Sequence, residues 1–177
     1  MLVGLAGHDI RRAMEIFLDF CKSGHIGNKE LLKIRALSGN YSLPYGVVTR
    51  VLLRLSRRFY DGDASHVKNL FQADPDEQTP NHLVRFSILH WLRDRRKQPG
   101  PTGVRGFHRV AKLISELGVI GFTVERIQRE LLYLVASHYV YTEHQRTDTL
   151  NPDDLVIIAP AGFATLRLSR QLDYLAA

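Results

Sequence analysis

The stretch IQRELLYLVASHYVYTE, residues 127–143, decides the fold, because its periodicity changes from helix to strand within one continuous segment. Ile127, Leu131 and the pair Leu134 and Val135 recur at three- and four-residue spacing, which is typical of one buried face of an amphipathic helix. The residues that follow, YVYTE, are β-branched and aromatic and favour a strand. We therefore expect a helix that runs directly into a β-strand.

The flanking segments predict a partner strand and further helices. LVIIA, residues 155–159, is a second β-branched run, and the polar segment HQRTDTLNPDD separates it from the first, so the two indicate a hairpin. Helical spacing precedes this hairpin in residues 81–97 and 107–118, and Thr123 can cap the helix that contains Ile127. A final helix is expected after Ala161 and Gly162.

Three helices, a hairpin and a C-terminal helix follow the order of a winged-helix domain. IQRELLYLVASHYVYTE resembles the third helix of that family running into the first wing strand. LVIIAPAGFATLRL, residues 155–168, resembles the second wing strand followed by a T/A-P-x-G helix start. The resemblance implies a winged helix in the C-terminal half of the chain.

The N-terminal part predicts a helical bundle. Residues 1–24, 28–37 and 47–60 read as helices, and QADPDEQTPN (72–81) is a polar segment, interrupted twice by proline, that predicts a linker. We expect a mainly α protein with a helical lid-like bundle in residues 1–75 and a winged-helix domain in residues 76–177.

The first helix opens with GHDIRRAMEIF, residues 7–17. Asp9 can cap its first turn, and Arg11 and Glu15 stand at ion-pair spacing. The predicted buried face combines the apolar residues at helical spacing, which are Ile10, Ala13, Met14, Phe17 and Cys21.

GHDIRRAMEIF resembles the start of the lid subdomain in AAA+-like and STAND-type P-loop ATPases. In that family a G-x-[IA]-R-R-A-L type pattern brings the sensor-2 arginine onto the nucleotide. The resemblance makes Arg11 the nucleotide-sensing candidate and Arg12 its neighbour, and a guanidinium suits phosphate oxygens. No G-x-x-x-x-G-K-[ST] phosphate loop follows, so ATP would bind in an ATPase core outside this chain. Lid helices before a winged helix also match the C-terminal layout of origin-recognition-type initiators.

The formal net charge of +6 indicates an acidic partner, with nucleic acid first. Four arginines stand on one face of the helix predicted in residues 47–60, and no acidic residue occurs between Pro44 and Tyr60. They are Arg50, Arg54, Arg57 and Arg58. A second cluster spans two helices and their loop: Arg93, Arg95, Arg96, Lys97, Arg105, His108, Arg109 and Lys112. Both clusters suit nonspecific contact with duplex phosphates, but pairing with acidic residues elsewhere is an equally open interpretation.

The third helix of the winged helix carries a mixed set of charges. Its exposed positions are expected to be Thr123, Glu125, Arg126, Gln128, Arg129 and Glu130. The two glutamates disfavour a groove lined with phosphates, so the sequence of this helix favours docking on a protein over sequence-specific reading of DNA.

Catalytic and metal-binding patterns are not found in the sequence. The histidines lack metal-ligand spacing, and no nucleophile elbow occurs, so we expect neither an enzyme nor a cofactor in this chain. The single cysteine, the charged first 25 residues and the lack of an 18-residue apolar window predict a cytoplasmic protein that does not bind membranes.

These observations favour a non-catalytic C-terminal regulatory module of a P-loop ATPase, which docks DNA or protein through the winged helix and the arginine faces. Its partners would be the missing ATPase core and either nonspecifically bound DNA or a protein. The alternative is a free-standing winged-helix DNA-binding regulator whose N-terminal helices dimerise. A third interpretation, a purely structural interaction module, requires only the apolar stripes.

Overall fold

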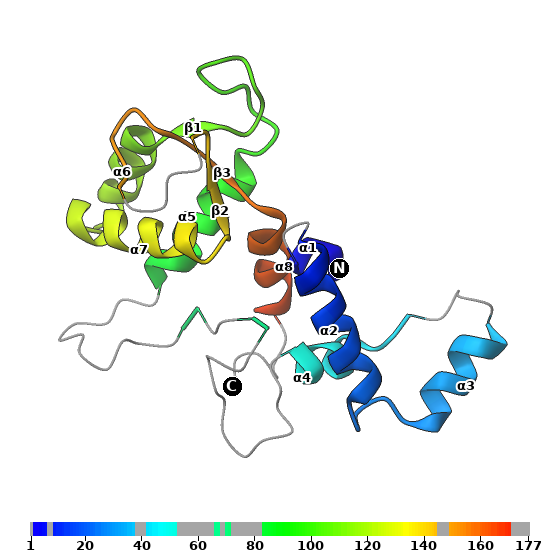
Figure 1. Ribbon diagram of the computed structural model, residues 1–177. Helices are drawn as coiled ribbons and strands as arrows, with labels where there is room; N and C mark the ends of the chain where they lie inside the picture. The colour runs from blue at the N-terminus through cyan, green and yellow to red at the C-terminus, as the bar shows by residue number, and fades with distance from the viewer. Residues whose placement is uncertain are drawn as a thin grey trace. The chain divides into compact units, whose positions relative to one another are not determined.

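The computed structural model describes residues 2–6, 9–37, 42–52, 66–67, 70–71, 83–144 and 149–170. As predicted, the chain is mainly helical with a small antiparallel sheet (Figure 1). It divides into two compact units, of which the first comprises Met1–Asn69 with Arg167–Ala177 and the second comprises Leu70–Leu166. The boundary predicted between residues 75 and 76 lies outside the described residues.

The first unit contains four helices in its described part: α1 (Leu2–Leu5), α2 (Ile10–Lys22), α3 (Asn28–Ala36) and α4 (Tyr45–Leu52). Its fully buried side chains include Leu5, Ile16 and Leu52. Helix α3 buries none of its residues, and its N-cap, Gly27, makes no side-chain cap hydrogen bond. A helix shorter than about 12–15 residues is only marginally stable in water without packing, because most helical stability in proteins comes from a buried face.

The buried face predicted for α2 is wrong. Ile10, Met14 and Phe17 are exposed, with 81%, 54% and 51% of their surface accessible, and Cys21 is exposed as well. The buried residues are instead Ile16 and Phe20, on a face about 100° around the helix axis from the predicted one. Both sides of α2 carry apolar residues at i, i+4 spacing, so periodicity alone does not distinguish them, and packing against neighbouring elements decides.

The second unit combines helices with short strands (Figure 1). Along the chain its elements are α5 (Leu83–Asp94), β1 (His108–Arg109), α6 (Val110–Val119), α7 (Val124–Ala136), β2 (Val140–Thr142), β3 (Leu155–Ile158) and α8 (Pro160–Leu168). The sheet has the order β1-β3-β2, and both pairings are antiparallel. Thr142 lies opposite Val156 in the hairpin, which confirms the pairing of YVYTE with LVIIA. The division between the two units falls within α8.

The sequence predicted a helix from residue 107, but His108 and Arg109 form strand β1. His108 lies opposite Val156, and the helix begins only at Val110. The first helical amide of α6, that of Val110, donates to Asp154 O at 3.0 Å. Strand β3 thus pairs with His108 and Arg109, although their sequence pattern is that of the helix that follows them. This long-range pairing overrides local helix propensity.

Helices α5, α6 and α7 pack together with the sheet around one apolar core. Helix α5 contacts α6, α7 and β3, and it buries more than one face. The fully buried core side chains include Ile88, Leu89, Leu113, Ile127 and Leu131. No described helix is long and apolar enough to cross a membrane.

Candidate nucleic-acid interface

A short turn joins helices α6 and α7. Residues 120–123 join them, and Gly121 has φ +100°, a conformation that glycine adopts readily. Thr123 caps α7 as predicted, because its hydroxyl oxygen accepts a hydrogen bond from the Arg126 amide at 3.4 Å. A short turn that contains glycine is a feature of helix-turn-helix motifs.

Glu130 is not on the exposed face of α7, where its sequence context predicted it. It follows Ile127 by three residues and precedes Leu134 by four, so it falls on the buried stripe, and only 4% of its surface is accessible. Its carboxylate Oε2 accepts a hydrogen bond from Arg85 Nε at 2.5 Å. The Arg85 guanidinium also stacks 4.1 Å from the centre of the Tyr133 ring.

The buried Arg85–Glu130 pair changes the charge that α7 presents. Of the two glutamates that disfavoured DNA, only Glu125 is exposed. Arg129 is exposed on the same helix, with its Nε 3.7 Å from Glu130 Oε1, and Arg126 is half-buried. The exposed surface of α7 is therefore less acidic than the sequence suggested.

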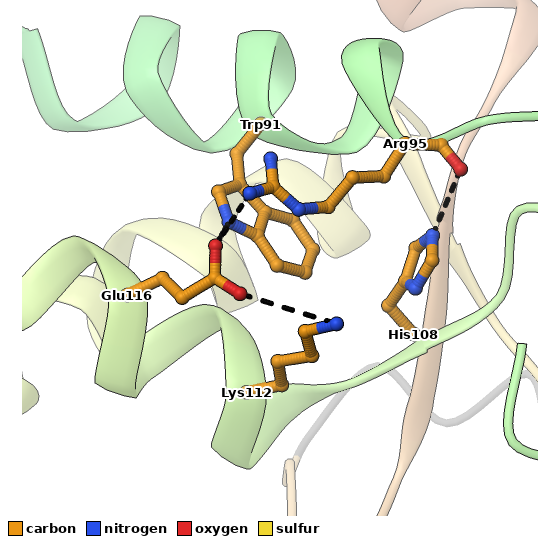
Figure 2. A network of polar contacts seen from close by, with 5 residues as sticks. All are labelled: Trp91, Arg95, His108, Lys112 and Glu116. Atoms are coloured by element: carbon orange, nitrogen blue, oxygen red, sulfur yellow. Dashed lines mark hydrogen bonds and ion pairs between the residues drawn. The ribbon is translucent and has the colours of Figure 1, made fainter. Parts of the chain in front are cut away.

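A polar network joins the end of α5, α6 and β1 (Figure 2). Glu116 Oε2 accepts hydrogen bonds from Trp91 Nε1 at 2.9 Å and from Arg95 Nη2 at 2.5 Å. The Arg95 guanidinium lies 4.4 Å from the centre of the Trp91 ring. His108 Nε2 lies 3.0 Å from the carbonyl oxygen of Arg95, and because a carbonyl only accepts, the ring nitrogen donates. The network connects the C-terminal end of α5 to α6 and to β1.

Ion pairs neutralise much of the second basic cluster predicted from the sequence. Each of these pairs involves a carboxylate of the second unit: Arg93 with Asp94, Arg95 and Lys112 with Glu116, and Arg109 with Asp153. Arg109 and its partner are both exposed, and their nitrogen and oxygen atoms lie 3.2 Å apart. Such surface pairs stabilise little, but they lower the charge available to an outside partner.

Three cations of the cluster stay exposed on the loop between α5 and β1. Arg96, Lys97 and Arg105 have no carboxylate partner among the residues that the structure describes. Arg96 lies with its guanidinium 4.8 Å from the centre of the Phe163 ring. Figure 1 shows this loop extending away from the helices of the second unit.

The arginine candidates of the first unit differ in their exposure to solvent. Arg11 is exposed and forms the predicted pair with Glu15, with Nε and Oε1 3.2 Å apart. Arg12 is half-buried, and its Nη2 donates to the carbonyl oxygen of His66 at 3.2 Å. Arg50 is exposed in the last turn of α4, whereas the rest of the predicted arginine face lies outside the described residues: Arg54, Arg57 and Arg58.

Metal ligands do not gather in the described parts of the chain: no group of three or more His, Cys, Asp or Glu side chains is placed to hold an ion. The comparisons with known proteins add no relative. No protein-family model, no curated protein and no solved structure matches the chain.

Sequence reasoning missed two features of this surface. It placed Glu130 outside, although its spacing from Ile127, Leu131 and Leu134 puts it on the buried stripe. It also treated the second basic cluster as one surface, because the partners of Arg95 and Arg109 lie 21 and 44 residues away along the chain. Helical spacing could have identified the first feature, whereas the second required tertiary contacts.

Proposed function

We propose that this chain is a non-catalytic binding module whose second unit is a winged helix that binds duplex DNA. The order helix, strand, helix, helix, strand, strand, with β3 between β1 and β2 in the sheet, supports this assignment. The observation that carries it is the α6–turn–α7 motif followed directly by the β2–β3 hairpin. In a helix-turn-helix the second helix enters the major groove with its N-terminal residues against the bases.

The charge of α7 favours DNA over a protein partner. Glu130 is removed from the surface by its pair with Arg85, and the exposed Arg129 offers donors to phosphate or to a base edge. The net charge of +6 adds general attraction to a polyanion. Docking on a protein remains the competing outcome of the test.

Binding of duplex DNA at low salt tests the proposal. We expect fluorescence anisotropy to detect a complex whose affinity falls steeply with salt. Arg129→Gln should weaken it, by about 1–3 kcal/mol if the side chain reads a base, and then unequally between sequences. Arg35→Gln, a change of an exposed arginine on α3, is the matched control and should have a smaller effect. The absence of any duplex affinity at low salt would make the DNA assignment wrong and favour a protein partner.

A second role is proposed for the helical part, which the sequence assigns to a lid-like bundle in residues 1–75. The observation that favours it is Arg11, whose side chain is 89% exposed near the N-terminus of α2, while Arg12 is tied to His66. We propose that Arg11 contacts nucleotide in the core of a P-loop ATPase of which this chain is the C-terminal part. A Walker motif in frame upstream of codon 1 in the genome would support this role, and a stop codon in that frame before any such motif would contradict it.

A further inference from the structure

The loop between α5 and β1 forms a basic hairpin, defined as residues 96–106. Its two sides are joined by hydrogen bonds of 3.0 Å from Gly106 N to Gln98 O and from Gly100 N to Val104 O, and Pro99 bridges to Arg105. No acidic residue occurs between Arg95 and Phe107. The hairpin therefore presents Arg96, Lys97 and Arg105 on an ordered backbone.

The conformation of the basic hairpin requires glycine at three positions. A Cβ atom on Gly100 would lie 2.3 Å from Phe107 O and 2.6 Å from Val104 O, so no other residue fits there. Gly103 and Gly106 have φ +79° and +85°, which side chains rarely allow. The observed conformation of the basic hairpin therefore depends on these three glycines.

The base of the basic hairpin is anchored to the folded core. Arg95, the residue before it, is held by Glu116 and by His108, and Arg96 lies over the Phe163 ring (Figure 2 shows the first two). The ion pairs that neutralise the rest of the basic cluster do not reach the three hairpin cations. Their charge is available to an outside anion.

We infer that the basic hairpin is a second DNA contact, in which Arg96, Lys97 and Arg105 bind backbone phosphates. This inference rests on the proposed function, because it assigns a further contact to the same DNA-binding unit. Phosphates require exposed cations and no apolar pocket. The only exposed large apolar side chain on the hairpin is Val104, whereas protein interfaces centre on aromatic and apolar anchors. The surface therefore suits a polyanion better than an acidic protein.

The test is the salt dependence of duplex binding by the full chain. If each cation neutralises one phosphate, the triple variant Arg96→Gln, Lys97→Gln, Arg105→Gln should reduce the slope of log affinity against log salt by about 2.7. Between 50 and 200 mM salt, the wild type should then lose about 40-fold more affinity than the variant does, for every duplex sequence alike. The charge-preserving variant Arg96→Lys, Lys97→Arg, Arg105→Lys should keep the wild-type slope.

A matched control separates local contact from net charge. Lys22→Gln, Lys29→Gln, Arg35→Gln removes the same charge from exposed positions of the first unit and should change the slope much less. If it changes the slope as much as the hairpin variant does, the effect is one of net charge and the inference is wrong. If the wild type binds DNA and Arg129→Gln weakens it, but the hairpin variant keeps the wild-type slope, the inference fails while the proposed function stands. If the wild type binds no duplex, both fail.

Discussion

Helices α2 and α7 are built alike and packed differently. Each has 13 residues, and in each an N-cap oxygen, that of Asp9 or Thr123, accepts from the third residue of the helix. Helix α7 buries five residues, whereas α2 buries two and leaves Ile10, Met14 and Phe17 exposed. Local rules thus determine that a helix forms and where it begins, and they leave its buried face to the neighbouring elements.

The buried charge in α7 is the sharpest difference between the two helices. Glu130→Ala would leave the Arg85 guanidinium buried without its carboxylate, and we expect a loss of about 3–5 kcal/mol in the free energy of unfolding. Urea denaturation of the full chain measures this loss. On α2, Glu15→Ala breaks only the exposed pair with Arg11 and should cost less than about 1 kcal/mol.

The double variant Arg85→Met, Glu130→Met controls for the loss of volume. Because it removes both charges and keeps apolar bulk, its stability should lie much closer to the wild type than that of Glu130→Ala. If Glu130→Ala lowers the free energy of unfolding no more than Glu15→Ala does, the Arg85–Glu130 pair is not buried. Glu130 would then lie on the surface of α7, as the sequence predicted.

Truncating one apolar side chain on each helix compares the buried face of α7 with the exposed apolar face of α2. Leu131 is fully buried on α7, so Leu131→Ala should destabilise the chain by about 2–5 kcal/mol. Met14→Ala on α2 removes an exposed side chain and should change stability by no more than about 0.5 kcal/mol. Thermal and urea unfolding both report these values. An equal cost for the two changes would mean that Met14 is covered in solution, which would fit the alternative in which the N-terminal helices dimerise.

Removal of the N-caps tests the feature that α2 and α7 share, a side-chain oxygen that accepts from a first-turn amide. Asp9→Ala and Thr123→Ala each remove one side-chain acceptor from a first-turn amide, and each should cost about 1 kcal/mol. Amide hydrogen exchange at Arg12 and Arg126 reports the loss locally. Asp9→Asn and Thr123→Ser retain an acceptor and are the conservative controls. A large cost at one cap and none at the other would show that the caps depend on tertiary packing.

The sequence by itself determined the elements with strong local signals. The period of Ile127, Leu131 and Leu134 predicted α7, and the β-branched runs predicted β2 and β3. The caps at Asp9 and Thr123 were also predictable, because each depends only on residues three apart. Of the candidate site, the sequence identified the cations and their concentration around the loop before β1.

Only the tertiary structure decided which of those cations remain available and which faces are buried. His108 and Arg109 joined the sheet because β3 offered a partner, although their own segment continues a helical pattern. Glu116 and Asp153 neutralised Arg95 and Arg109, and left the charges of the basic hairpin exposed. Helical periodicity contains no information on partners that lie 20 or more residues away along the chain. Pairing and burial are long-range interactions, and they determine the surface on which the proposed function depends.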